Sequence, residues 1–332
     1  MGEDGGFPFS FVLRFIVRIR PLALSAVALS AVLLAGCSSS APEADASPSG
    51  PPVVDLCSAA APAGDASDAV TVDGAVGEES TATFTSPLEI TTLQTTVIEE
   101  GSGDPVESGE LVTYALSAFN AETGEKLGSI GYDDNPVLPV QISPDNPVGQ
   151  ILGCATPGTR VVVAYPPADP NPGQVYVFDF VATVPNAAWG EPQEPMAGLP
   201  EVTLADDGAP TIEIPDTDAP AELQLDTLKK GDGATVAPGD TVLVQYTGVK
   251  WSDGSVFDSS WENGAPASFQ TTGVVDGFRQ ALEGQTVGSQ VLVVIPPALG
   301  YGEGEINDKD LVGETLVFVV DILGAQHAAP TQ

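Results

Sequence analysis

Basic side chains are the scarcest feature of this sequence. Lys and Arg together number 10, against 46 Asp and Glu, and the formal net charge is −36. Binding to nucleic acid and adsorption to anionic lipid both require basic patches that neutralise phosphates. The sequence therefore excludes both classes of function. We interpret the acidity as a source of solubility through self-repulsion, with a specific acidic binding surface as the alternative.

Residues that bind metals or carry redox chemistry are also few. The chain has one histidine, His327, and three cysteines, none of them in a Cys-x-x-Cys motif. The acidic loop at residues 303–314 lacks the spacing of an EF-hand, so we expect no metal and no cofactor. Cys57 and Cys154 are predicted to form a disulfide in an exported chain; two free thiols are the alternative. His327 lies in a predicted disordered tail, 327–332, and we assign it no role.

The N-terminal apolar run is too short to span a bilayer. Three arginines precede the 14 apolar residues 22–35, whereas a spanning helix needs about 20. This pattern predicts a signal peptide over residues 1–36. The stretch "LLAGC" that ends at Cys37 resembles a bacterial lipobox. That resemblance implies cleavage before Cys37 and attachment of lipid to its thiol; a plain secretory signal is the alternative.

A lipid on Cys37 would hold the mature chain stably on a membrane. We therefore predict a location outside the cytoplasm, on the outer face of the bacterial cell membrane. Residues 37–65 are rich in Ser, Pro and Ala. Because such a composition cannot form a core, we predict that they are a flexible tether.

Two parts of the remaining chain resemble each other when one is slid by 130 residues. The matching stretches are "LGCATPGTRVVVAYPPA" with "LEGQTVGSQVLVVIPPA", and "VIEEGSGDPVESGELV" with "TLKKGDGATVAPGDTV". Upstream of each, two short β runs flank an Asp/Gly turn, which predicts a hairpin in both parts. We predict one fold present twice, at residues 66–188 and 199–326, with a Pro-rich linker at residues 189–198.

Both copies are predicted to consist mostly of β-strands. The predicted strands of the second copy, rich in Val, Leu, Ile and Phe, are residues 241–249, 289–295 and 315–323. Only one segment has helical spacing, with Val275, Phe278 and Leu282 at i, i+3 and i+7 before Gly284. We expect an α+β fold in which each copy is a curved antiparallel sheet wrapped around one short helix.

Four separated motifs in the second copy resemble those of one protein family. In chain order they are "QYTGVKWSDGSVFDSS", "VVDGFRQALEGQTVGS", "IPPALGYG" and "TLVFVVDIL". Together, over roughly residues 222–324, they resemble an FKBP-type peptidyl-prolyl cis-trans isomerase domain. The first copy resembles the same fold in outline only. The resemblance implies an apolar pocket for proline that needs no nucleophile, metal or general base.

The resemblance also implies roles for individual residues. The positions that it marks as catalytic are Tyr246, Asp258 and Tyr301. The positions that it marks as substrate-binding are Phe257, Val274, Val275, Phe278 and Phe318. It places the carboxylate of Asp258 beside the bound carbonyl. It makes the Tyr301 hydroxyl a hydrogen-bond donor to the ligand carbonyl and the Val275 N–H a donor to the ligand. Taken singly, each residue has a structural interpretation, as a core aromatic, a turn residue or the buried face of a helix.

Several positions depart from the family pattern. Phe278 stands where the family most often has tryptophan, and Ala267 stands where a further pocket aromatic is common. The loop at residues 303–314 lacks the usual Ile-Pro-Pro sequence. The first copy departs more, because Leu116 takes the place of Tyr246 and no Phe-Asp pair occurs near residues 127–131. We predict that the first copy is not catalytic.

The chemistry of proline isomerisation suits an apolar aromatic pocket. An Xaa-Pro amide rotates slowly because rotation breaks C–N resonance, with a barrier of about 18–20 kcal/mol. The twisted transition state is less polar than the planar amide, so an apolar pocket favours it. We predict a monomeric isomerase that assists the folding of unfolded or proline-containing exported polypeptides. The alternative is a non-catalytic, chaperone-like or scaffold lipoprotein that binds such segments.

Overall fold

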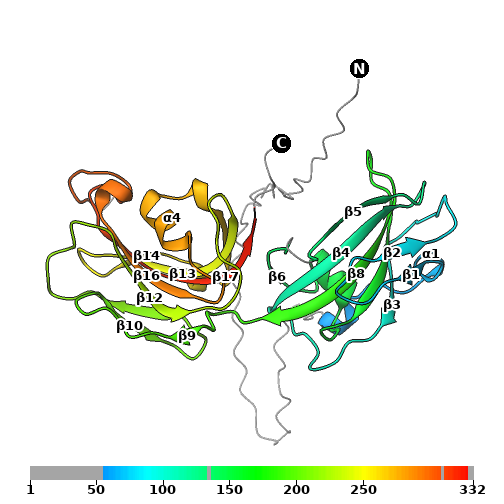
Figure 1. The fold of residues 1–332 in the computed structure, drawn as a ribbon, viewed down its shortest axis with the longest axis horizontal. Helices are drawn as coiled ribbons and strands as arrows, with labels where there is room; N and C mark the ends of the chain where they lie inside the picture. Colours follow the sequence, from blue (N-terminus) through cyan, green and yellow to red (C-terminus); the bar gives the residue numbers. More distant parts are fainter. Residues whose placement is uncertain (1–54, 133–135, 308–309, 328–332) are drawn as a thin grey trace, which may run out of the picture. The chain divides into compact units, whose positions relative to one another are not determined.

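The computed structural model describes residues 55–132, 136–307 and 310–327. The predicted signal peptide, Cys37 and most of the predicted tether lie outside these residues. Within the described part of the chain, no helix is long and apolar enough to cross a membrane. Two antiparallel sheets, each with a hairpin and short helices, account for most of the described residues. We refer to these two assemblies as the first copy and the second copy (Figure 1).

The first copy is built on a sheet of six strands with the order β3-β7-β8-β4-β5, and β6 pairs with β4. The strands are β3 (Gln94–Glu99), β4 (Leu111–Asn120), β5 (Lys126–Ile130), β6 (Val140–Gln141), β7 (Arg160–Tyr165) and β8 (Gln174–Val184). A hairpin of β1 (Thr71–Asp73) and β2 (Thr81–Thr83) precedes the sheet. The helical segments are η1 (Leu56–Ser58), α1 (Asp65–Asp68) and α2 (Pro147–Leu152).

The second copy is built on a sheet of seven strands with the order β14-β13-β17-β16-β12-β9, and β15 pairs with β13. The strands are β9 (Glu191–Pro192), β12 (Gln224–Lys230), β13 (Thr241–Lys250), β14 (Val256–Ser259), β15 (Ala267–Gln270), β16 (Gln290–Ile295) and β17 (Leu316–Gln326). Its hairpin is β10 (Glu201–Leu204) with β11 (Pro210–Glu213). The helical segments are α3 (Ser260–Asn263), η2 (Thr271–Gly273), α4 (Asp276–Leu282) and η3 (Pro297–Leu299).

The two sheets share their strand order and the positions of their β-bulges. Strands β3 to β8 correspond to β12, β13, β14, β15, β16 and β17 in chain order. Three register shifts recur 130 residues apart: Val97/Glu99 with Thr227/Lys229, Thr113/Tyr114 with Leu243/Val244, and Ala118/Phe119 with Gly248/Val249. Because bulges interrupt pairing at specific residues, the two sheets share one pattern of strand pairing as well as one strand order.

Each sheet is covered on both faces, which explains the long apolar runs of its central strands. In the second copy, every residue of β16 is buried, as expected for a strand with no solvated face. One face packs against α4 through Phe278, Ala281 and Leu282. The hairpin covers the opposite face with Val202 and Ile212.

The predicted hairpins, strands and helix are confirmed within a few residues at their ends.

The expectation of a flexible tether is wrong for residues 55–65. Leu56 is only 5% exposed and belongs to an apolar cluster with Leu152 of α2. The predicted disulfide between Cys57 and Cys154 is present and fixes this segment beside α2. A buried leucine, one covalent link and backbone hydrogen bonds from Ala61 to Gln150 and from Thr95 to Pro62 therefore order a stretch whose composition indicates flexibility.

The predicted linker is bound to the second sheet rather than free. Glu191 and Pro192 form β9 and pair with Lys230 and Lys229 of β12. The predicted tail also begins one residue too early, since Nδ1 of His327 lies 2.9 Å from a carboxylate oxygen of Asp240. The short helix α3 is a further element that periodicity did not predict, because four residues are too few to show a helical repeat.

Candidate active site: an aromatic cluster with one carboxylate

Four of the predicted pocket residues form one aromatic cluster in the second copy. Tyr246 lies on β13, Phe257 on β14, Phe278 on α4 and Phe318 on β17. The ring of Phe318 is at the centre, with centroid distances of 5.0 Å to Phe278, 5.4 Å to Phe257 and 6.2 Å to Tyr246. Phe278 and Phe257 contact it edge to face, the arrangement that aromatic quadrupoles favour. Residues from three strands and one helix thus converge, as the motif order predicted.

A fifth ring, Phe269, belongs to the cluster and was missed by the sequence analysis. Its centroid lies 5.7 Å from that of Tyr246 and 6.0 Å from that of Phe278. Ala267, where the family commonly has an aromatic, is two residues earlier on the same strand, β15. Because side chains at i and i+2 of a strand share one face, this alternation was a readable signal. Phe269 therefore supplies aromatic surface next to the position that Ala267 leaves small.

Gly248 permits the contact between two of these rings. A Cβ atom at Gly248 would lie 2.7 Å from ring atoms of both Phe257 and Phe318. Real Cβ atoms do not approach other atoms so closely, so any side chain here would displace one of the rings. The glycine in "QYTGVK" is therefore part of the site, although it contributes no side chain. The matching residue of β4 in the first copy is Ala118.

The polar centre of the cluster is a hydrogen bond between two predicted catalytic residues. The hydroxyl of Tyr246 donates to Oδ2 of Asp258 over 2.6 Å. Tyr246 is 6% exposed, whereas Asp258 is exposed. Burial, reinforced by the hydrogen bond to Asp258, raises the pKa of Tyr246 above its usual range. The tyrosine therefore stays protonated and remains a hydrogen-bond donor at any physiological pH.

The two serines that follow Asp258 form hydrogen bonds next to Tyr246: Ser260 with the Tyr246 backbone, and Ser259 with the neighbouring Thr247. The Tyr246 N–H donates to Oγ of Ser260 over 2.8 Å, and that hydroxyl donates in turn to Gln245. Ser259 caps α3 and exchanges a hydrogen bond of 3.1 Å with Thr247. The "DSS" sequence thus contacts both the hydroxyl and the backbone of Tyr246. This explains how a short exposed strand positions a buried tyrosine.

The remaining predicted residues surround this cluster at different depths. Val274 and Val275 are half-buried and pack against the cluster from the start of α4. Val275 is the N-cap residue of α4, and no described side chain caps that end. Tyr301 is 53% exposed and follows η3, near enough to contribute to the raised pKa of Tyr246. The structure therefore brings all eight predicted positions to one region, with Tyr301 the most accessible.

The first copy has different chemistry at the matching positions. The registers and the 130-residue offset place Leu116, Leu127, Val148 and Tyr176 where the second copy has Tyr246, Phe257, Phe278 and Phe318. The residue matching Asp258 is Gly128. The hydroxyl of Tyr176 donates to its own strand neighbour Gln174. A carboxylate facing a tyrosine hydroxyl is thus missing from these positions, which supports a difference in function between the copies.

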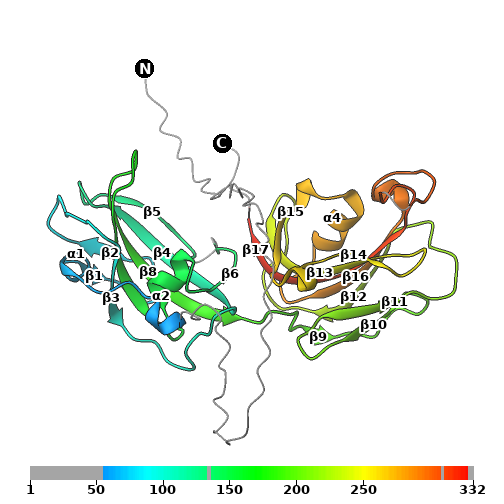
Figure 2. The same cartoon turned by 180° about the vertical axis from the view of Figure 1, so that it is seen from behind.

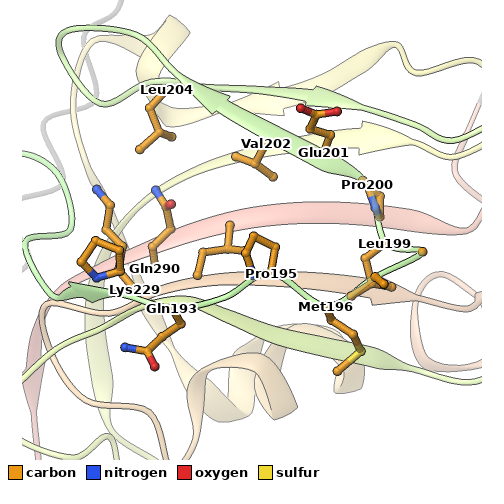
Figure 3. A pocket seen from close by; sticks show the side chains of 14 residues that line it. Gln193, Pro195, Met196, Leu199, Pro200, Glu201, Val202, Leu204, Lys229 and Gln290 are labelled. Carbon is orange, nitrogen blue, oxygen red and sulfur yellow. The ribbon is translucent and has the colours of Figure 1, made fainter.

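A separate cavity of about 530 Å³ lies on the opposite face of the second sheet. The segment after β9, strand β10 and residues Leu228, Lys229 and Gln290 line it (Figure 3). None of the predicted site residues lines this cavity. Across residues 55–132, 136–307 and 310–327, no group of three or more His, Cys, Asp or Glu could hold a metal ion.

The fold and the site together define an α+β binding domain in which the hydrogen-bonded pair of Tyr246 and Asp258 lies within a wall of aromatic side chains. Residues 233–323 match the family model of the FKBP-type peptidyl-prolyl cis-trans isomerases. A protein of Corynebacterium glutamicum named "Probable FK506-binding protein" is 38% identical over 116 residues, which are 35% of this chain and 98% of that protein. The "FK506-binding protein" of Streptomyces anulatus is 38% identical over 117 residues, or 34% and 94% of the two chains.

A third relative extends the comparison beyond these two. The "FKBP-type 22 kDa peptidyl-prolyl cis-trans isomerase" of Escherichia coli K12 is 44% identical over 101 residues, which are 30% of this chain and 48% of that protein. With nearly the whole length of two relatives covered, the chain belongs to the FKBP-type peptidyl-prolyl cis-trans isomerase family. The predicted resemblance is confirmed. The family match falls within the second copy, which carries the aromatic cluster.

Proposed function

We propose that the second copy catalyses cis-trans isomerisation of Xaa-Pro bonds in polypeptides that fold outside the cytoplasm. The observation that carries this proposal is the aromatic cluster closed by the 2.6 Å hydrogen bond from Tyr246 to Asp258. Phe257, Phe278 and Phe318 form apolar walls of the size and kind that a proline ring contacts. Membership of the isomerase family supports the same activity.

Catalysis in such a site requires no covalent step. The Xaa-Pro amide loses resonance and polarity as it twists, so a pocket with few polar groups disfavours the planar ground state relative to the transition state. A ten-thousand-fold acceleration needs about 5.5 kcal/mol of such differential stabilisation. The roles proposed for Val275, Asp258 and Tyr301 are to orient the peptide: an N–H donor, a carboxylate beside the carbonyl, and an accessible hydroxyl donor. Val274 completes the apolar wall.

We further propose how the whole chain is organised. Residues 66–188 and 199–326 are two FKBP-like domains, each a curved sheet around one short helix, and the shared strand order supports this division. Residues 1–36 are a signal peptide, and Cys37 carries a lipid that holds a monomeric chain on the outer face of the membrane. Substitution Cys37→Ala should move the protein from the membrane fraction to the soluble fraction, as detected by immunoblotting.

The isomerase proposal is tested on residues 38–332 with a peptide that contains an Xaa-Pro-Phe sequence. The cis-to-trans rate should rise with wild-type protein and fall at least tenfold with Asp258→Ala or Tyr246→Leu, equivalent to about 1.4 kcal/mol or more. Glu262→Ala is the matched control, because Glu262 is an exposed acid close in sequence to Asp258. It should retain wild-type activity.

A second candidate function is a chaperone-like protein without catalysis. Phe278 in place of the family's usual tryptophan and the exposure of Tyr301 favour it. If the wild-type chain accelerates no Xaa-Pro peptide yet still binds unfolded polypeptides, this second function replaces the first. Equal rates for wild-type protein and Asp258→Ala would show that the aromatic cluster is not the active site.

A further inference from the structure

The second sheet ends in a strand whose outer edge is covered. Strand β12 pairs with β16 on one side and with β9 on the other. Lys229 and Lys230 are paired with Pro192 and Glu191, and the Gln193 N–H donates to the Leu228 carbonyl over 2.9 Å. The chain itself therefore supplies an antiparallel strand to residues 228–230. Such covering removes an edge that would otherwise pair with another chain.

The matching edge of the first sheet has no added strand among the described residues, where β12 has one. Residues 98–100, which are the last two residues of β3 and the one after it, correspond to 228–230, since the bulges of β3 and β12 coincide. The segment before the first sheet crosses this edge earlier, where the Thr95 N–H donates to the Pro62 carbonyl over 3.1 Å. No strand in the described part of the chain pairs with β3 other than β7. Within that part, residues 97–100 therefore form a short unpaired edge.

The backbone geometry of β3 points a donor outward at this stretch. In an antiparallel strand, the N–H and C=O groups of residues i and i+2 face the same side. The N–H of Thr95 faces away from β7, because it donates to Pro62. Val97 lies two residues later, before the bulge between Val97 and Glu99. Its N–H therefore faces the open edge, in position to pair with an added strand.

The side chains at this edge define the chemistry of the strand that would fit. Val97 is 52% exposed and Ile98 is 43% exposed, whereas Leu228, the counterpart of Ile98, packs in the second copy. Glu99 and Glu100 follow and are also exposed. An added strand with apolar residues beside the first pair and Lys or Arg beside the second pair would bury the former and neutralise the latter.

A second copy of the chain is a poor occupant of this edge. Antiparallel pairing of residues 97–100 with themselves would set Glu100 opposite Val97 and Glu99 opposite Ile98, so that neither glutamate gains a cationic partner. Two chains that each carry a net charge of −36 also repel each other. An unfolded polypeptide, in contrast, offers extended backbone and basic residues in many sequences. Addition of an extended peptide to a sheet edge is an established mode of recognition.

We propose that residues 97–100, at the end of β3 and just after it, form a docking site for an extended apolar and basic segment of an unfolded polypeptide, which adds to the first sheet as an antiparallel strand. This site lies in the copy that lacks the aromatic cluster, and its function is binding rather than isomerisation. It would hold a client chain while prolines elsewhere in that chain reach the second copy. Because docking does not depend on catalysis, an experiment can contradict the docking proposal without contradicting the isomerase proposal, and the reverse.

The test measures binding of a fluorescein-labelled Val-Lys peptide, with the sequence Lys-Lys-Val-Val at its centre, to residues 38–332 by fluorescence anisotropy. The wild-type chain should bind saturably, and binding should weaken between about 0.1 M and about 1 M salt because charges are screened. Val97→Pro removes the outward N–H without removing a bond to β7, and should weaken binding at least tenfold. A peptide with methylated backbone nitrogens, which cannot pair, should not bind.

Matched variants distinguish pairing at the strand edge from non-specific binding of the peptide. Ile98→Lys should weaken binding at least tenfold, whereas Val181→Lys, which changes a valine of similar exposure (45%) on β8, should not. Glu99→Lys combined with Glu100→Lys should reverse the preference, so that a Val-Glu peptide binds better than the Val-Lys peptide. This double variant changes no backbone group, so it remains a valid test of the docking site even if Val97→Pro does not fold.

Three results would overturn the proposal. One is unchanged affinity in Ile98→Lys and in the double charge variant. Another is binding of the methylated peptide as tightly as its parent. The third is a wild-type dimer in sedimentation that Val97→Pro or Ile98→Lys converts to monomer, which would make a second copy of the chain the occupant. Isomerase activity measured in parallel should be unchanged in all these variants, since none alters the aromatic cluster.

Discussion

The two copies differ in their side chains far more than in their backbones. Both have the same strand order and the same three bulges, yet Tyr246 and Asp258 of the second copy form a hydrogen bond at positions where the first has Leu116 and Gly128. The edge strands also differ, since β9 pairs with β12 in the second copy (Figure 2), whereas among the described residues no strand pairs with residues 98–100 of the first. A fold is thus maintained by the pattern of strands, while function depends on a few residues placed on it.

The largest expected effect comes from removing the disulfide, which is a covalent difference between the two copies. Only the first copy has a disulfide, and it closes a loop with a sequence separation of 97 residues. Replacing both Cys57 and Cys154 with alanine should lower the free energy of unfolding of the first copy by about 4–5 kcal/mol in the chain-entropy model. Urea unfolding should show an earlier transition for the first copy alone. A shift in the transition of the second copy would contradict this assignment.

The next largest effect on stability is expected at a pair of buried positions that correspond between the two copies but differ in charge. Arg160 of the first copy and Gln290 of the second occupy the same register position, opposite Asp179 and Asp321. Arg160 donates two hydrogen bonds, of 2.6 and 2.7 Å, to the fully buried carboxylate of Asp179. These bonds raise the pKa of Arg160.

Substitution of Arg160 should therefore leave a buried charge without its partner. Arg160→Gln, which copies the second sheet, should cost about 3–5 kcal/mol of unfolding free energy. Gln290→Ala, the matched change in the second copy, removes one hydrogen bond and should cost only about 1–2 kcal/mol. Chemical denaturation of both variants checks the ranking, and equal losses would show that the ionic pair has no special weight.

A smaller effect should follow from the glycine between the two phenylalanine rings. Gly248→Ala places a methyl group against Phe257 and Phe318 and should destabilise the second copy by about 1–3 kcal/mol through overpacking, with a loss of isomerase activity. The matched control is Ala118→Gly in the first copy, which should cost about 0.5–1 kcal/mol by increasing backbone entropy. Thermal unfolding and the peptide assay together check both. Retention of full activity in Gly248→Ala would show that the two rings are free to move apart.

The smallest effect concerns the pH dependence of stability in the second copy. Burial raises the pKa of Asp321, although hydrogen bonds from Ala188 and Gln290 and the nearby Lys229 oppose the shift. The folded state therefore keeps a proton that the unfolded state loses above about pH 4. The contribution of this group to stability falls as pH rises from that value through its folded-state pKa, with a slope of at most about 1.4 kcal/mol per pH unit. Asp321→Asn should flatten the stability curve above about pH 4, and an unchanged slope would argue against a raised pKa.

The sequence determined much of this protein without help from tertiary structure. The central strands and the helix around Phe278 follow from patterns of neighbouring residues, because burial of one face imposes a fixed period on a strand or helix. The disulfide was predicted from the number of cysteines in a chain expected to be exported. The eight site positions were predicted because their motifs occur in a fixed order.

Only the tertiary structure decided which residues touch. Gly248 proved necessary to the aromatic cluster because its contacts cross strands, which no local pattern records. The alternation along β15 indicates the face of Phe269, but only the fold places that face against Tyr246 and Phe278. Leu56 became part of a core although its surroundings in the sequence indicate a tether. Whether a strand covers β12 or, among the described residues, leaves residues 97–100 unpaired depends on where a connecting segment crosses a sheet edge. Local sequence sets the conformation of each segment, but the partners of a side chain or a strand edge are set by burial between segments that are distant in the chain.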